Sequence, residues 1–261
     1  MATRIKADMI DQIDYNRIME MYNDRFKEAG DFTFLFVGNI NLEEAKPLIE
    51  TYLGGLPTIN RKENFQDIKL DRRKGNHKNV FEKQLETPKA TVISVISGNC
   101  EYNLKNNILM SMLSQTMDMV YTETIREKEG ASYGVSAYGQ ISRYPKKEAV
   151  FQIYFDTDPA KREKMEQIVM AELQKVTQEG PRPEHLAKVK EFMLKKHLEN
   201  EKENGYWVSQ LTQYYWYNID MNTNYEKLVN EITAEDVKNF AKALLDQGNI
   251  IEVTMTAEGT K

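Results

Sequence analysis

Apolar residues recur every three to four positions between Ile10 and Phe26, which predicts an amphipathic helix in the first part of the chain. Asp14 is placed to cap this helix, and Ile13 and Ile18 are placed to form a hydrophobic staple around the cap. The apolar run 32–38 then predicts a strand that is buried on both faces.

The same helix-then-strand pattern returns at the end of the chain. Residues 232–255 fall on residues 13–36 without a gap, so that Ile232 matches Ile13 and Val237 matches Ile18. Thr233 takes the N-cap place that Asp14 has in the first copy. Few residues are identical, so the repeat is one of pattern. It predicts a helix–strand unit that closes two related domains, the first present here only as its last portion.

A polar stretch with charges of both signs, residues 60–78, separates the two copies. Its basic end, 72–78, lies close to acidic residues and holds no interleaved aromatic residue, so an exposed linker is favoured over a basic binding patch. The predicted organisation is therefore the C-terminal end of a truncated domain (1–59), a charged linker (60–78) and a complete domain (79–261).

The third region contains both strand and helix patterns. Strands are expected at 79–85 and 90–98, and alternation with period two predicts an antiparallel pair at 131–142 and 148–157. Helices are expected at 103–128, 158–177, 183–204 and 206–218. Along this region the predicted strands come mainly first and the predicted helices mainly after them. This order predicts an α+β fold with an antiparallel-containing sheet and helices packed on one face.

Composition narrows the function classes. Among 261 residues, 41% are hydrophobic and the net charge is −5, so the chain can form a core but is no obvious nucleic-acid binder. Its one cysteine, Cys100, excludes an internal disulfide and a cysteine-based zinc site. No apolar run is long enough to cross a bilayer, so no membrane span is expected. The N-terminus shows no signal-peptide pattern and enters a helix within a few residues, as in a piece of a longer protein.

The histidines give no metal motif. None of His77, His185 and His197 lies three or four positions from another histidine, so no metal ligands are predicted in this chain. His197 and Glu201 are spaced for a weak ion pair on an exposed helix. An aromatic run at 206–217 leaves two interpretations open, core packing or the wall of an interface or chamber.

The segment TIREKEGASYGVSAYG, which joins the predicted helix 103–128 to a predicted strand, carries the candidate chemistry. Arg126 stands at the helix end, where a cation suits the helix dipole, and Tyr133 stands where the strand begins. From spacing alone, an architectural role explains both residues.

Three stretches, FTFLFVGNINLEEAKPLIETYLGGLP, TIREKEGASYGVSA and ITAEDVKNFAKALL, change this interpretation. In this order and spacing they resemble the M16 zinc metallopeptidases, the family of pitrilysin, insulinase and mitochondrial processing peptidase. The resemblance covers essentially the whole chain. It implies a duplicated M16 domain, because full-length members have two halves of two homologous domains each, closing around a peptide chamber.

The resemblance also implies roles for the two candidate residues. The family's zinc motif, H-x-x-E-H, lies in its first domain and is absent here, so zinc is expected only in the full-length parent. Arg126 and Tyr133 match an arginine–tyrosine pair that the family uses for substrate: Arg126 would hold the peptide backbone, and Tyr133 would stabilise the substrate carbonyl or its oxyanion. Gly130 and Gly134 would let peptide backbone come close.

The resemblance thus implies that this chain is the C-terminal substrate-binding portion of a metalloendopeptidase that cleaves peptides or small unfolded proteins. The chain by itself is expected to be inactive. Its expected partners are the peptide substrate and the N-terminal half of the same protein or a homologous catalytic subunit. The alternative is a non-catalytic scaffold or partner subunit of an M16-type complex. The resemblance places the parent in the bacterial periplasm or the cytoplasm, and leaves the compartment of this piece open.

Overall fold

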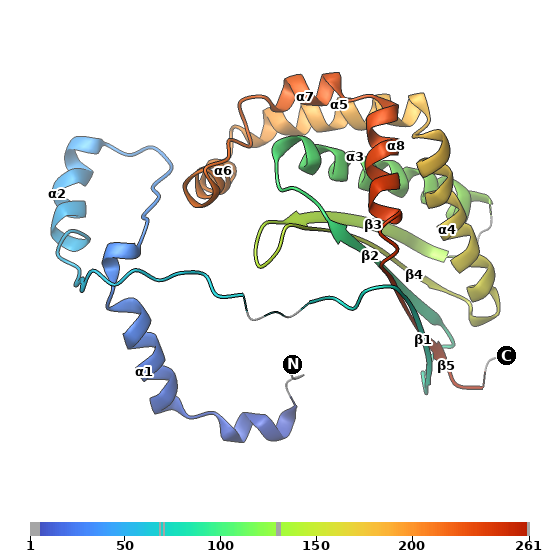
Figure 1. Ribbon diagram of the computed structural model, residues 1–261, viewed down its shortest axis with the longest axis horizontal. Helices are drawn as coiled ribbons and strands as arrows, with labels where there is room; N and C mark the ends of the chain where they lie inside the picture. Colours follow the sequence, from blue (N-terminus) through green and yellow to red (C-terminus); the bar gives the residue numbers. More distant parts are fainter. Residues whose placement is uncertain (1–5, 68, 70, 129–131, 260–261) are drawn as a thin grey trace. The chain divides into compact units, whose positions relative to one another are not determined.

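A computed structural model describes residues 6–67, 69, 71–128 and 132–259 (Figure 1). The chain divides into two compact units. The amino-terminal unit comprises Met1–Arg72 with Asn204–Thr212, and the sheet unit comprises Arg73–Glu203 with Gln213–Lys261. The domain boundaries expected from the sequence stay predictions. Strand β1, Asn76–Lys83, begins inside the range 60–78 expected to be a linker.

The amino-terminal unit is helical where the apolar period predicts a helix. Its elements are a 3₁₀ turn at Ala7–Gln12, helix α1 at Tyr15–Phe26, a second 3₁₀ turn at Ala29–Asp31 and helix α2 at Leu42–Tyr52. The predicted cap is confirmed, because the Asp14 carboxylate accepts a hydrogen bond from the backbone N–H of Arg17 at 3.1 Å.

One buried carboxylate organises the loop beyond α2. Glu28 accepts hydrogen bonds from the backbone N–H groups of Gly30 (3.0 Å), Ile59 (2.9 Å) and Arg61 (2.8 Å), and from the Thr58 hydroxyl (2.5 Å). These donors, that of Thr58 first, hold the pKa of Glu28 at about 2. The ionised carboxylate thereby ties residues 58–61 to the end of α1.

The strand predicted at 32–38 does not form. Within the described residues this segment pairs with no other strand, and Phe32, Phe34 and Phe36 are 38%, 44% and 54% exposed. The prediction was wrong because an apolar strand also needs a neighbouring strand to hydrogen-bond with, and its own sequence cannot supply one. Phe32 instead packs edge-on against Phe26 and Phe34.

The sheet unit is built on one five-stranded sheet with the order β1-β5-β2-β4-β3. The strands are β1, β2 (Ala90–Asn99), β3 (Ser132–Ser142), β4 (Glu148–Thr157) and β5 (Ile250–Ala257). β1 and β5 run parallel, and the other neighbours run antiparallel. The predicted pair β3–β4 is confirmed, with Ala137 opposite Ile153 and Ser142 opposite Glu148.

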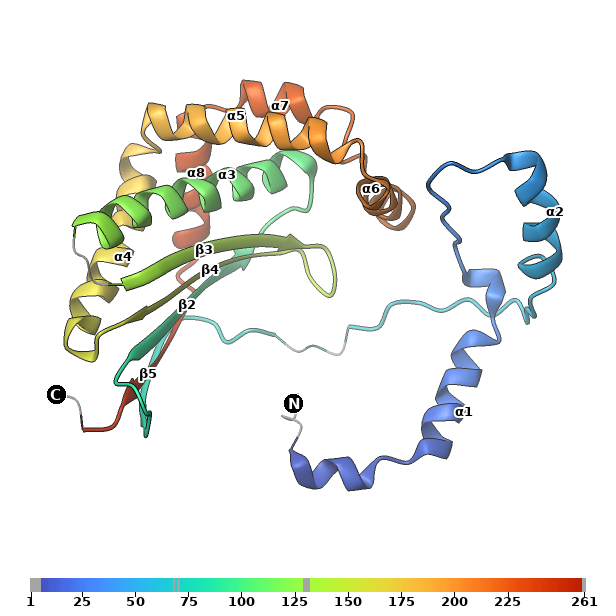
Figure 2. The ribbon, with the colours of Figure 1, turned by 180° about the vertical axis from the view of Figure 1, so that it is seen from behind.

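The helices of this unit lie on one side of the sheet in both views, as the sequence predicts (Figures 1 and 2). They are α3 (Leu104–Tyr121), α4 (Arg162–Glu179), α5 (Pro183–Asn200), α7 (Tyr225–Glu231) and α8 (Ala234–Leu245). Between sheet and helices lies a core that includes the fully buried Phe151, Ile153, Met112 and Leu113. No described helix is both long and apolar enough to cross a membrane.

The aromatic run falls on helix α6, Asn204–Tyr217. Tyr214, Tyr215 and Trp216 are 50%, 61% and 70% exposed, so core packing is wrong for these three side chains. The fourth residue of the run's end, Tyr217, contacts Arg143. The Arg143 guanidinium donates to the Tyr217 carbonyl at 2.7 Å and lies 5.0 Å from the centroid of its ring.

Candidate functional site

The joint between α3 and β3 is not the continuous α-helix that the sequence predicted. The α-helix ends at Tyr121, and residues Thr122–Lys128 continue as a π-helix before β3 begins at Ser132. Thr122, Thr124 and Ile125 are β-branched and weaken the α-helical form, and the Thr122 hydroxyl donates to the Asp118 carbonyl at 2.8 Å. π-Helical turns are rare and occur frequently at functional sites.

Both residues predicted to contact the substrate lie at this joint. Arg126 falls within the π-helical segment Thr122–Lys128, and Tyr133 is the second residue of β3. Their side chains, and Gly130, lie outside the described part of the structure, so their roles stay predictions. Gly134 is described, and a Cβ added there would meet no described atom within 4 Å.

The core side of the segment is anchored by packing. Ile125 is fully buried in the main core. Four positions earlier, the fully buried Tyr121 donates its hydroxyl to the Val169 carbonyl of α4 at 3.1 Å. Thr124 donates to the Glu172 carboxylate at 3.4 Å. Helix α4 therefore supports the end of α3 and the first half of the segment.

The strand after the joint is held close to α3. The backbone N–H of Ala137 donates to the Asp118 carboxylate at 2.7 Å, so α3 satisfies a donor on the edge strand β3. Burial raises the pKa of Asp118, and the Ala137 N–H partly opposes that rise. A Cβ at Gly139 would lie 2.1 Å from the Met110 sulfur, so a larger residue there would require the Met110 side chain to move.

Helix α5 supplies a third anchor, which the sequence did not reveal. Glu123, in the first turn of the π-helical segment, accepts a hydrogen bond from His185 Nε2 at 2.9 Å and pairs with Arg182. Hydrogen bonds from both partners lower the pKa of Glu123, that from Arg182 more than that from His185. We call these three residues the Glu123 clamp. Glu123 lies 59 positions from Arg182 and 62 from His185 along the chain, and no periodic signal joins it to them.

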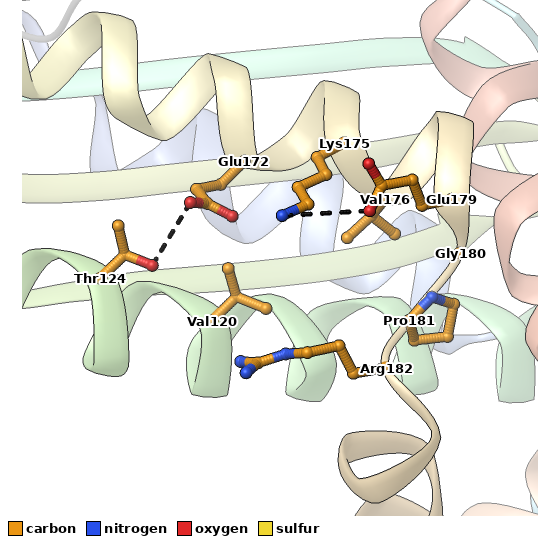
Figure 3. Close-up of a pocket in the computed structure, with 9 residues that line it drawn as sticks. All are labelled: Val120, Thr124, Glu172, Lys175, Val176, Glu179, Gly180, Pro181 and Arg182. Carbon is orange, nitrogen blue, oxygen red and sulfur yellow. Dashed lines mark hydrogen bonds and ion pairs between the residues drawn. The ribbon is translucent and has the colours of Figure 1, made fainter.

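A small pocket lies beside this clamp, between the end of α3 and the end of α4 (Figure 3). Its wall is formed by Val120, Thr124, Glu172, Lys175, Val176, Glu179, Gly180, Pro181 and Arg182. Gly180 ends α4 with a φ of +79°, a conformation that favours glycine and turns the chain toward α5. This turn places Arg182 in the pocket wall and within reach of Glu123.

The remaining histidines serve packing and local hydrogen bonds. His197 is buried rather than on an exposed helix face, because its ring stacks on Tyr225 with centroids 4.3 Å apart, and Glu201 lies 3.5 Å from its Nε2. His77 contacts the Lys74 carbonyl at 2.7 Å. Among the described residues, no group of three or more His, Cys, Asp or Glu side chains is arranged to hold a metal ion.

The sequence is similar to a known protein family and to two curated proteins. Residues 12–193 match the family model described as the peptidase M16 inactive domain. The chain is 23% identical over 229 residues to a PQQL-like zinc protease of Arabidopsis thaliana (81% of this chain, 23% of that protein). It is 22% identical over 251 residues to a probable zinc protease PqqL of Haemophilus influenzae (94% and 26%). The chain thus spans about a quarter of the length of these curated relatives.

Solved structures share the fold. The periplasmic protease PqqL from Escherichia coli superposes with a TM-score of 0.84 at 17% identity, covering 98% of this chain and 28% of that one. Pitrilysin superposes with a TM-score of 0.67 at 14% identity, covering 99% and 28%. The family model covers well over half of the chain, from helix α1 into helix α5. The chain belongs to the M16 peptidase family.

Proposed function

We propose that this chain is the substrate-binding portion of an M16-type zinc metalloendopeptidase that cleaves peptides or small unfolded proteins. The observation that carries the proposal is the position of Arg126 and Tyr133 at a π-helical joint in a chain of this family. The relatives' names, zinc protease in both curated cases, agree with it.

In this proposal Arg126 and Tyr133 recognise the peptide backbone of the substrate. A guanidinium presents donors in a rigid fork, so Arg126 suits main-chain carbonyls. The phenol of Tyr133 donates one hydrogen bond to a substrate carbonyl and favours the charge that develops on its oxygen during attack. Gly134, the next residue, would let peptide backbone come close, since a Cβ there would contact no described atom.

Zinc does not fit the described residues of this chain, because they bring no three metal-binding side chains together. The proposal therefore gives the metal and its ligands to another part of the parent protein or to a homologous subunit. This chain contributes the binding and orientation of the peptide. The relative from Escherichia coli is described as periplasmic, and we extend that compartment to this protein as part of the proposal.

The test is reconstitution. This chain is mixed with the zinc-binding remainder of its parent, zinc is added, and cleavage of a quenched fluorescent peptide is followed. We expect activity only when both pieces are present, and a fall in activity with Arg126→Ala or Tyr133→Phe. Glu179→Ala, which removes an exposed α4 carboxylate, is the matched control.

A non-catalytic scaffold is the second candidate, and the description of the matching family model as an inactive domain favours it. Under that function the two pieces bind one another and no cleavage appears at any zinc concentration. Association is measured by analytical ultracentrifugation in the same samples. Binding without cleavage would replace the peptidase proposal with the scaffold.

A further inference from the structure

The π-helical segment Thr122–Lys128 needs support, because its hydrogen-bond pattern is less stable than that of an α-helix. Packing of Ile125 fixes its core side, but packing alone does not select a π-helix over an α-helix. In an α-helix each backbone N–H donates to the carbonyl four residues earlier, and in a π-helix to the carbonyl five residues earlier. Each residue of an α-helix rotates the chain by about 100° about the helix axis. Relaxation of the segment to the α form would shift its hydrogen bonds by one residue, and would therefore change the direction of every later side chain.

The Glu123 clamp acts at the first turn of this segment, where the choice of register is made. Each Glu123 carboxylate oxygen has its own partner at the start of α5: Oε1 faces His185 Nε2 at 2.9 Å, and Oε2 pairs with Arg182, the residue just before the helix. A carboxylate only accepts, so Nε2 carries the proton in this hydrogen bond. Two partners at two oxygens fix the direction of the side chain as well as its position.

The two halves of the clamp are not equal. The Arg182 side chain is 51% exposed, so water and salt weaken its pair with Glu123. The His185 ring is only 1% exposed, and its Nδ1 has no hydrogen-bond partner among the described residues. Loss of Glu123 would leave both ring nitrogens buried without a partner, and this makes the His185 contact the stronger restraint.

We propose that Glu123, with His185 and Arg182, is a positioning residue for peptide binding: it holds residues 122–128 in the π-helical register and so sets the backbone position from which Arg126 would bind the substrate. The inference rests on the proposed function for the role of Arg126. It adds a residue that touches no substrate and acts through the backbone between positions 123 and 126. The pocket beside the segment gives it room to move once the clamp is removed.

The first measurement is hydrogen–deuterium exchange on the 261-residue chain, which needs no catalytic partner. We expect Glu123→Ala to speed exchange at amides 122–128 about tenfold, which corresponds to about 1.4 kcal/mol of local opening. Amides 108–117 in the middle of α3 are expected to stay protected. Glu123→Gln keeps an oxygen acceptor for His185 but loses the charge, and should fall between wild type and Ala.

The second measurement is anisotropy of fluorescein-labelled casein, an unfolded protein, on the same variants. We expect Glu123→Ala to weaken binding about tenfold, with partial rescue in Glu123→Gln, because the peptide contact loses its alignment. Glu179→Ala removes a carboxylate from the α4 end of the same pocket without touching residue 123, and should change neither measurement.

Three results would overturn the inference, and they separate it from the proposed function. Unchanged exchange at 122–128 in Glu123→Ala would show that the clamp does not hold the register. Faster exchange with unchanged casein binding, while Arg126→Ala still weakens binding, would show that the register does not aim Arg126. If Arg126→Ala and Tyr133→Phe also leave binding unchanged, the peptide-binding function itself is wrong, and the clamp is only a structural contact.

Discussion

The cap of helix α8 offers a stability prediction that can be worked through quantitatively. Thr233 and Asp236 form a capping box: the Asp236 carboxylate accepts from the Thr233 backbone N–H (2.9 Å) and hydroxyl (2.6 Å), and the Asp236 N–H donates to that hydroxyl (3.2 Å). Lys105, in the first turn of α3, donates to the same carboxylate at 3.1 Å. Asp236→Ala removes all contacts of this carboxylate in one step.

The magnitude follows from the pKa of the carboxyl. The Thr233 donors first, and Lys105 after them, hold the pKa of Asp236 at about 2, against an ordinary value of 3.8. A decrease of this size on folding corresponds to an upper bound of about 2.4 kcal/mol. The side chain is 31% exposed, so solvent screening reduces that bound, and measured helix caps cluster near about 1 kcal/mol. We therefore expect Asp236→Ala to destabilise the chain by about 1–1.5 kcal/mol at pH 7.

The sign of the pH dependence is fixed by the same pKa. Because folding lowers the pKa of Asp236, its contribution is fully present well above pH 3.8 and is lost as pH falls toward about 2. Urea unfolding followed by far-ultraviolet circular dichroism, at pH 7 and at pH 3, measures it. By pH 3 roughly half of the difference between wild type and Asp236→Ala should have disappeared.

The matched control for this variant is Asp246→Ala. Asp246 pairs with Lys242 at 2.5 Å at the other end of α8, but its side chain is 61% exposed, so its removal should cost no more than about 0.5 kcal/mol. Equal destabilisation by Asp236→Ala and Asp246→Ala at pH 7 would refute the reasoning. So would a difference between wild type and Asp236→Ala that stays constant from pH 7 to pH 3.

Three further outcomes are expected. Tyr133→Phe should lower turnover of the reconstituted peptidase without changing the urea midpoint of this chain, since only a hydroxyl donor is lost; unchanged peptide cleavage would remove Tyr133 from the catalytic set. The 261-residue chain alone should show no peptidase activity, because the H-x-x-E-H motif is absent from it; chelator-sensitive cleavage by a rigorously purified sample would contradict this. Glu166→Ala should destabilise the sheet unit by about 2–3 kcal/mol, because this buried carboxylate pairs with Lys78 (2.6 Å) and Arg162 (3.2 Å) and accepts from Thr254 (3.0 Å), while Lys78 keeps its second partner Glu252. A loss below about 1 kcal/mol in urea unfolding would show that the Glu166 network is only a surface pair.

The local sequence pattern by itself determined the helix caps, the alternating strands and the family resemblance of this protein. The capping residues Asp14 and Thr233 are visible in the sequence because they precede an apolar helical period, and both caps form. The alternation that predicts β3 and β4 also fixes which face of each strand is buried, since side chains alternate between the faces of a sheet. The resemblance to M16 peptidases was carried by short motifs of the same local kind, and the family model confirms it.

Tertiary structure decided what depends on residues distant in the chain. The first copy of the helix–strand repeat, ending in 32–38, lies exposed and unpaired within the described residues. Its second copy becomes β5, paired between β1 and β2. The two sequences carry the same apolar pattern, but a strand is completed by the hydrogen bonds of its neighbours, which the strand does not encode. For the same reason the π-helical joint and the Glu123 clamp could not be predicted, because their partners reach residues 122–128 only once α4 and α5 have packed.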